Sequence, residues 1–261
     1  MVVLGSLYCK QGRVLEAQAL LMRSLETRMQ QGGEGHPDVL SILHNIAGLH
    51  AEQGLLDLAE HFYSQCLRQR TGILGPQHPL TLSTLASLAA TYSLQGKTDN
   101  AEHLLTECYE QCCRCRQNLG TDSPIPLGTS LGLGEDAALT LTVLNNIAFN
   151  CELQGQGRRA ETLYKQCLVK RRLALGKDHP STLSSGNNLA ALYVTQGQQL
   201  QKAELMLQET ISARQARSGI SHPDTLRSTN NLASLYVKSG RMQAGLEVYS
   251  DCCEEAAEGL G

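Results

Sequence analysis

The chain of 261 residues has no tryptophan and only two phenylalanines, so leucine, alanine and tyrosine must fill any hydrophobic core. A net charge of −3 argues against a nucleic-acid-binding surface, which would need clustered positive charge. No apolar run approaches the roughly 18 residues that a membrane-spanning helix requires. The first residues also lack the basic segment and the cleavage site of a secretory signal. We therefore expect a cytoplasmic protein without membrane insertion and without a nucleic-acid partner.

Recognisable catalytic motifs are missing as well. The sequence contains no P-loop, no His-Glu-x-x-His pair and no Ser/His/Asp pattern. We therefore expect no enzymatic activity and no cofactor.

A His-Pro pair instead returns at a nearly fixed interval, at His36-Pro37, His78-Pro79, His179-Pro180 and His222-Pro223. The first two pairs lie 42 residues apart and the last two 43. Ala137 stands in the same frame, 42 residues before His179. A self-similar period of this size indicates stacked supersecondary units, and such arrays usually bind other proteins.

Each unit is predicted to form two helices separated by an internal glycine, which is Gly54, Gly96, Gly155, Gly197 or Gly240. Ahead of the glycine, apolar residues recur at helical spacing, and the proline suits the first turn of a helix. After it, an Ala-Glu pair begins a second apolar stripe that ends near Leu74-Gly75 or Leu175-Gly176. Glycine at that end is expected to adopt the left-handed conformation.

This period divides residues 1–261 into one elongated array of about six units. The expected divisions are 1–35 (a partial repeat), 36–77, 78–120, 137–178, 179–221 and 222–261, with a Gly/Ser/Pro-rich loop at 121–136. The loop is read either as a tolerated surface insertion or as a regulatory or partner-binding segment. Because both ends lack a polar capping repeat, we expect the sequence to be a fragment of a longer protein.

Helix–turn–helix units with Gly, Ala and Tyr at these intervals resemble the tetratricopeptide repeat. The LGxxHPxTL junction, the NNLAxLY phrase and an arginine eight residues before the histidine (Arg28, Arg70, Arg171 and Arg214) are similar to the repeat domain of kinesin light chains. The resemblance implies an all-α superhelix, or α-solenoid. It also implies an adaptor that clamps an extended segment of a partner protein in its concave groove.

The expected binding residues are asparagines nine residues after the histidine frame: Asn45, Asn146, Asn188 and Asn231. They are predicted to lie on the inner edge of the first helices, where an amide offers both a donor and an acceptor to a peptide backbone. Asparagines at this frame line the cargo groove in the proteins that the chain resembles. Alternatively, each asparagine bonds a neighbouring helix. Arg227 and Lys238 share the concave frame and place positive charge only at its C-terminal end.

Recurrent histidines, glutamates and cysteines receive structural interpretations. The histidines are expected to start helices rather than to bind a metal, and Glu60, Glu102, Glu161 and Glu204 to be first-turn carboxylates favoured by the helix dipole. Cys66, Cys108, Cys167 and Cys252 occupy one frame and are predicted to pack as free, small hydrophobic residues. The local cluster Cys108, Cys112, Cys113 and Cys115 lacks a zinc-knuckle spacing, with metal or redox sensing as the alternative to a chance run.

Two functions follow from these observations. The first is a non-enzymatic adaptor that recognises cargo as kinesin light chains do, in a kinesin-type motor complex if heptads exist outside this fragment. The alternative is a regulatory or sensor array belonging to a larger signalling or nucleotide-switch protein. An upstream P-loop domain would favour the alternative.

Overall fold

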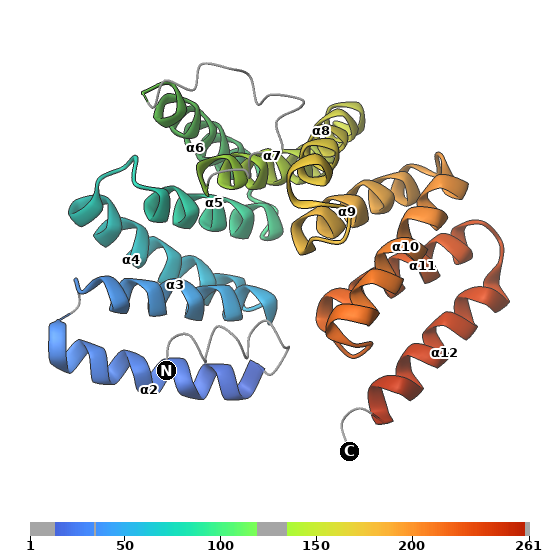
Figure 1. The fold of residues 1–261 in the computed structure, drawn as a ribbon, viewed down its shortest axis with the longest axis horizontal. Coiled ribbons are helices and arrows are strands. Elements are labelled where there is room, and N and C mark those ends of the chain that lie inside the picture. The colour runs from blue at the N-terminus through green and yellow to red at the C-terminus, as the bar shows by residue number, and fades with distance from the viewer. Residues whose placement is uncertain (1–13, 34, 119–134, 259–261) are drawn as a thin grey trace. The chain divides into compact units, whose positions relative to one another are not determined.

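The computed structural model describes residues 14–33, 35–118 and 135–258, and within them the chain is helical throughout, with no strand (Figure 1). Two kinds of helix alternate. The A helices, which begin at or near the His-Pro frame, are α3 (Pro37–Glu52), α5 (Pro79–Leu94), α7 (Glu135–Leu153), α9 (Pro180–Gln196) and α11 (Pro223–Lys238). The B helices, which follow the internal glycine, are α2 (Val14–Gly32), α4 (Leu56–Leu74), α6 (Thr98–Asn118), α8 (Gly157–Leu175), α10 (Leu200–Ser218) and α12 (Met242–Glu258). The predicted all-α class and its helix–turn–helix units are therefore confirmed.

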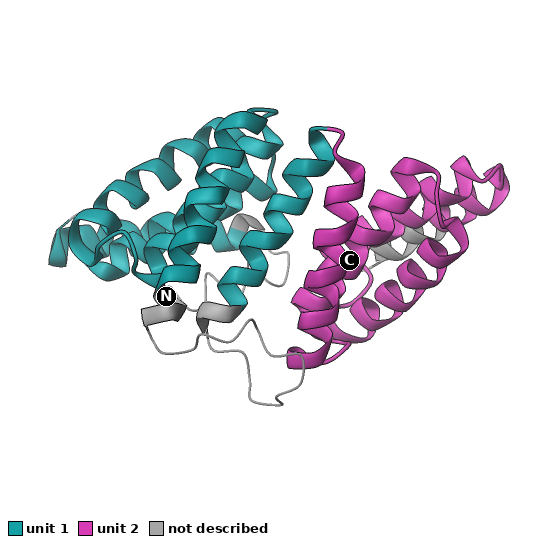
Figure 2. Ribbon diagram, turned by 90° about the horizontal axis from the view of Figure 1, so that it is seen from above, with its two compact units in different colours: residues 1–126, 133–154 teal, residues 127–132, 155–261 magenta. Residues whose placement is uncertain are grey.

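The chain divides into two compact units (Figure 2). Unit 1 contains α2 to α7, and unit 2 contains α8 to α12. Within each unit every helix packs on the next one along the chain, and A helices also pack on A helices, as α5 does on α7 and α9 on α11. Contacts between sequence neighbours of this kind are typical of a repeat array. Residues 1–13 of the first expected repeat and 121–134 of the expected loop lie outside the described residues.

The internal glycines turn the chain from an A helix to a B helix, as predicted. Gly54, Gly96 and Gly155 have φ between 75° and 78°, a backbone conformation that glycine adopts without steric cost. The 43-residue repeat places its extra residue in this turn. There Gly197 caps α9 with φ 66° and ψ 23°, and Gln199 also has a positive φ, of 49°.

The glycines that end the B helices correct one expectation. Gly75, Gly176 and Gly219 have φ near 87° but ψ between 162° and 169°. This is an extended conformation restricted to glycine and not the left-handed helical one. It takes the chain out of the B helix and into the short turn that precedes the next His-Pro pair.

Alanines and tyrosines fill the core where larger aromatic residues are missing. The alanine of each Ala-Glu pair (Ala59, Ala101, Ala160 and Ala203) is completely buried. In unit 1, Tyr63 and Leu88 pack beside Ala59, and in unit 2 Tyr164 and Tyr193 are fully buried. Among the described helices, none is both long and apolar enough to cross a lipid bilayer.

Candidate functional site

The four predicted asparagines stand at the same position of successive A helices. Asn45 and Asn146 belong to α3 and α7 of unit 1, and Asn188 and Asn231 to α9 and α11 of unit 2. All four side chains are half-buried. We call this set, with Ser87 at the equivalent position of α5, the asparagine face of each unit.

Contacts separate the asparagines into two pairs. The Nδ2 of Asn146 donates to the carbonyl oxygen of Ala86 at 3.4 Å, and that of Asn231 to the Oδ1 of Asn187 at 3.3 Å. Among the described residues, neither Asn45 nor Asn188 makes a side-chain hydrogen bond. One pair therefore contributes to the packing of neighbouring A helices, while the other pair has an unused amide.

The two cations predicted beside the asparagines both have partners. Lys238 is exposed, and its ammonium donates to the carbonyl oxygens of Val194 and Thr195 in the last turns of α9, at 3.2 and 3.4 Å. Arg227 forms an ion pair of 3.3 Å with Asp224 on its own helix. Lys238 thus bridges two A helices, whereas Arg227 is 63% exposed and adds only a local pair.

Exposed leucines occupy the corresponding edge of unit 1. Leu94 and Leu153 stand at the frame of Lys238 and are 52% and 47% exposed. They end α5 and α7, two A helices that pack on each other. Beside the asparagine face, this frame therefore holds Glu52 and two exposed leucines in unit 1, and Thr195 and Lys238 in unit 2.

A buried arginine joins each of three B helices to the A helix that follows it. Arg70, Arg171 and Arg214 are at most 6% exposed. Their Nη1 atoms donate to a main-chain oxygen in the first turn of the next helix (Leu80, Ser181 and Asp224) and to a hydroxyl one turn later (Thr84, Ser185 and Ser228). The sequence marked these arginines only as family signatures. Their role could have been found from the hydroxyl residue that stands 14 positions after each.

Arg28 shows what happens without that hydroxyl. Ile42 occupies the equivalent position, and Arg28 lies exposed with its Nε 3.5 Å from Asp38. A guanidinium is buried only where hydrogen-bond acceptors replace its hydration. In this chain the arginine is buried in the three places where the hydroxyl is present and exposed in the one where it is not.

The buried network continues into the preceding A helix. The Oγ1 of Thr84 lies 3.4 Å from the Nδ1 of His44, and the Oγ of Ser228 donates to the Oδ1 of Asn187 at 2.9 Å. Burial, together with the charge of Arg70, lowers the pKa of His44 from 6.5 to about 4. His44 is consequently neutral at physiological pH, as a site beside a buried cation requires.

The recurrent glutamates correct a second expectation. Glu60 is the fifth residue of α4, beyond the first turn where the helix dipole acts. Its Oε2 accepts hydrogen bonds from Gln95 and Lys97 in the next A–B turn, both at 2.9 Å. Equivalent bonds join Glu102 to Gln154 and Glu204 to Arg241. These carboxylates link successive repeats, and hydrogen bonding to Lys97 lowers the pKa of Glu60.

The histidines of the His-Pro pairs cap the A helices. The Nδ1 of His36, His78, His179 and His222 accepts a hydrogen bond from the main-chain N–H two residues later, at 3.1 to 3.2 Å. Each cap satisfies one of the donors left open at a helix start. No group of residues suited to hold a metal ion occurs in the described part of the chain.

The cysteines of the shared frame pack as predicted. Cys66, Cys108 and Cys167 are completely buried free thiols, and the first two donate to main-chain oxygens of the neighbouring A helix. Burial raises the pKa of Cys167 to about 11. Cys112 is also buried, beside Cys108, and Cys113 is partly exposed. The side chains of Cys115 and Cys252 lie outside the described residues.

Comparisons with known proteins agree with this repeat architecture. The tetratricopeptide repeat model matches residues 1–70, 38–114 and 139–216. No curated protein matches the chain in sequence.

Solved structures with similar folds share little sequence with the chain. One, from Podosopora anserina and described as a kinesin light chain with nearly identical TPR-like repeats, has 23% identity and a TM-score of 0.56, and the match covers 86% of this chain and 98% of that one. BtubC (BKLC) from P. vanneervenii has 19% identity, a TM-score of 0.59, and coverage of 96% and 92%. Rap protein complexed with Competence and Sporulation Factor has 12% identity, a TM-score of 0.65, and coverage of 97% and 74%. Because the family model covers most of the sequence and the helices repeat as that family requires, the chain belongs to the tetratricopeptide repeat family.

Proposed function

We propose that this protein is a non-enzymatic adaptor that holds an extended peptide segment of a partner on its asparagine face. Tetratricopeptide repeats are protein-interaction scaffolds and are typically non-catalytic. The proposal adds a specific surface and a specific kind of ligand to that general role. It also adopts the repeat divisions 36–77, 78–120, 137–178, 179–221 and 222–261, each of which would contribute one A helix to the asparagine face of its own unit. The adaptor would act in the cytoplasm, where its cysteines stay reduced.

The observation that carries the proposal is the unused amide of Asn45 and of Asn188. Each is half-buried and has no side-chain hydrogen bond among the described residues. A side-chain amide can donate to a carbonyl oxygen and accept from an N–H of an extended peptide, whatever the peptide's sequence. Asn146 and Asn231 would share the role through their amide oxygens.

Flanking residues give the proposed ligand its side-chain preferences. Leu94 and Leu153 in unit 1 would contact apolar side chains, and Lys238 and Arg227 in unit 2 would attract acidic ones. The proposed form of this role is cargo recognition of the kinesin-light-chain type. It would belong to a motor complex if heptads accompany the repeats.

A peptide-display selection on the intact chain tests the proposal. Peptides selected by the wild-type protein should bind the double variant Asn188→Ala/Asn231→Ala roughly tenfold more weakly or worse, because each lost bond contributes about 0.5–1.5 kcal/mol. Binding would be measured by calorimetry and folding by thermal melting.

A matched control is Thr195→Ala/Ser234→Ala, at exposed positions of α9 and α11. The hydroxyl of Thr195 donates to Ala191 on its own helix, and neither side chain is proposed to hold the peptide. If the asparagine variant melts much earlier while affinity per folded molecule is unchanged, the asparagines are structural and the assignment is wrong.

A regulatory or sensor array is the second candidate. The fold similarity to Rap protein solved with Competence and Sporulation Factor, and to the quorum sensor NprR from B. thuringiensis, favours it. The full-length gene separates the two functions. Flanking heptads would support the adaptor, whereas a neighbouring catalytic or nucleotide-switch domain would support the sensor.

A further inference from the structure

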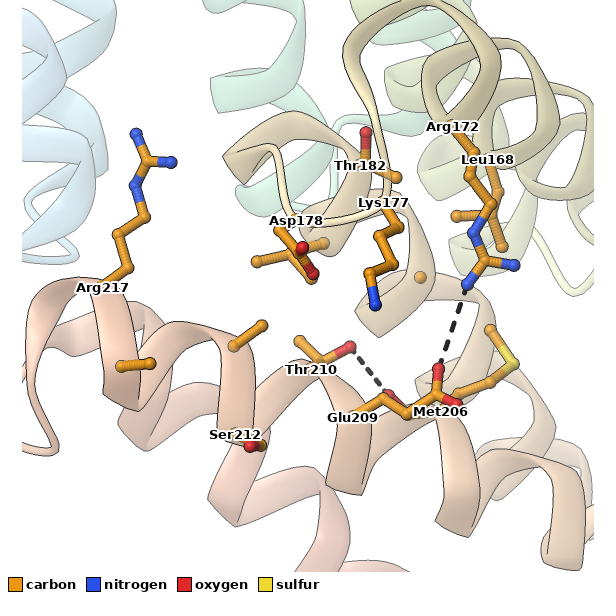
Figure 3. Close-up of a pocket in the computed structure, with 14 residues that line it drawn as sticks. Leu168, Arg172, Lys177, Asp178, Thr182, Met206, Glu209, Thr210, Ser212 and Arg217 are labelled. Atoms are coloured by element: carbon orange, nitrogen blue, oxygen red, sulfur yellow. Dashed lines mark hydrogen bonds and ion pairs between the residues drawn. The ribbon is translucent and has the colours of Figure 1, made fainter.

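Unit 2 contains a pocket of about 670 Å³ between α8, α9 and α10 (Figure 3). Leu168, Leu183, Met206 and Ala213 provide apolar lining, and Gly186 lies at the wall formed by α9. The volume falls in the range of small-molecule sites, which is about 300–1,000 Å³.

Gly186 leaves room at the α9 wall of this pocket. The equivalent residues of α3, α5 and α7 are Leu43, Leu85 and Leu144, all buried. A Cβ atom on Gly186 would meet Leu168 Cδ1 and Thr210 Oγ1 at 3.8 Å, which is ordinary contact. A glycine inside a helix also destabilises it relative to residues with a side chain. The pocket is therefore open because position 186 lacks the leucine side chain of the equivalent positions. A Cβ atom there would fit without a clash.

The pocket is separate from the asparagine face. Gly186 precedes Asn188 by two residues, which places the two about 200° apart around α9. The pocket is also lined by two B helices, whereas the asparagines stand on A helices. A ligand here would leave the proposed peptide surface uncovered.

Positive charge lies at the rim. Arg172 and Glu209 form an ion pair of 3.9 Å, while Lys177 and Arg217 have no ion-pair partner in the part of the chain that the structure describes. Figure 3 shows the Lys177 side chain extending toward Thr210 on α10. Asp178 is the remaining carboxylate of the lining, so the cations exceed the anions by one.

We propose that this pocket binds a small amphiphile with an apolar body and a carboxylate head group. The body would occupy the space beside Gly186 and contact Leu168 and Met206. The carboxylate would meet the ammonium of Lys177 at the rim. This site is independent of the peptide surface and goes beyond the proposed adaptor function.

Calorimetric titration with decanoate below its micelle concentration tests the proposal, with 1-decanol as the uncharged match. Decanoate should bind the wild-type protein more tightly than 1-decanol, with an affinity that falls as salt rises. Gly186→Leu should reduce decanoate affinity at least tenfold without lowering the melting temperature. Gly72→Leu is the matched control, because Gly72 is exposed in α4 with open space around it.

Lys177→Gln keeps the proposal testable should Gly186→Leu disturb folding. It should weaken decanoate binding several-fold and remove most of the salt dependence. Lys170→Gln, on α8 shortly before Lys177 but outside the lining, should do neither. Failure of decanoate to bind, equal binding to Gly186→Leu, or equal binding of 1-decanol would each overturn the proposal. The proposal would also be overturned if a peptide ending in leucine displaced decanoate and bound the pocket with higher affinity than decanoate. Peptide binding to Asn188 and Asn231 should be unchanged in Gly186→Leu, so that failure here leaves the adaptor proposal standing.

Discussion

A buried guanidinium is stable in this protein because neutral oxygens surround it. The Nη1 of Arg70 donates to the Leu80 carbonyl oxygen and to the Thr84 hydroxyl, while its Nε has no hydrogen-bond partner among the described residues. A buried charge that loses one acceptor cannot recover it from water. The hydroxyl of Thr84 therefore has a larger effect on stability than its size suggests.

Replacing Thr84 by valine tests this at constant shape. Thr84→Val should lower the free energy of unfolding by about 1–3 kcal/mol, because the arginine loses its shortest hydrogen bond. Chemical denaturation followed by circular dichroism measures the change. Thr71→Val, at an exposed position of the preceding repeat, should stay within about 0.5 kcal/mol. Equal effects of the two variants would contradict the role given to Thr84.

His44 should make stability depend on pH. In the unfolded chain it takes up a proton near pH 6.5, whereas in the folded chain its pKa is about 4. The unfolded state thus binds more protons between these values, so the free energy of unfolding falls as pH decreases from 6.5 to 4, by up to about 3 kcal/mol. Above about pH 7 it is unaffected.

Denaturation curves at pH 7 and pH 5 measure this term. His44→Gln should flatten the difference, since glutamine does not titrate, whereas His61→Gln at an exposed position should leave it unchanged. A wild-type protein with the same stability at both pH values would show that His44 is not held neutral.

The sequence was sufficient for residues whose role repeats within one helix, and insufficient for those that act across helices. The cysteine frame was predictable because a small apolar residue at a fixed point of an amphipathic helix has one environment. Glu60 was misread because its partners Gln95 and Lys97 lie 35 and 37 residues away, and helical periodicity carries no information on such pairs. The asparagine positions were predictable, but not which amides the array itself would use.

At the scale of the helix, the His-Pro pair combines two signals. Proline favours the first turn of a helix. The histidine side chain accepts a hydrogen bond from the main-chain N–H two residues later. The cap and the proline explain why the starts of α3, α5, α9 and α11 could be predicted, whereas α7, which lacks the His-Pro pair, begins at Glu135, two residues before its frame. The ends of the B helices were harder, because a glycine there signals a stop without indicating its ψ angle.

His179→Ala should destabilise the start of α9 by about 1 kcal/mol, whereas His179→Asn should retain most of the stability, since asparagine is a strong N-cap. Hydrogen exchange at the first turn of α9 reports the effect locally. His103→Ala, at an exposed position within α6, serves as the control. Equal loss in the alanine and asparagine variants would show that the imidazole contributes by packing and not as an acceptor.

At the scale of the whole molecule, the stability of each repeat is expected to depend mainly on its own contacts and on those with adjacent repeats. Helices within each unit pack on their neighbours along the chain, and repeat arrays of this kind combine local stabilities with nearest-neighbour terms. A destabilising substitution in one repeat should therefore lower local stability most in that repeat and in the adjacent one.

Hydrogen exchange over the intact chain measures this distribution. Thr84→Val should accelerate exchange in α4 and α5 of unit 1 and leave α10 and α11 of unit 2 close to wild type. Arg214→Met, in unit 2, should give the reverse pattern. Uniform acceleration throughout the chain in either variant would instead indicate a single cooperative transition.

The arginine contacts also bear on how such a protein can grow. Arg70 and Thr84 lie on opposite sides of His78, and Arg171 with Ser185, and Arg214 with Ser228, straddle His179 and His222 in the same way. Each contact between successive repeats uses one arginine and one hydroxyl residue, at the same distances from the His-Pro boundary. A gene segment running from one such boundary to the next would encode a hydroxyl residue near its start and an arginine near its end. The hydroxyl would pair with the arginine of the preceding repeat, and the arginine with the hydroxyl of the following repeat. Such segments are interchangeable parts, so duplication or exchange could lengthen the array without redesigning its joints.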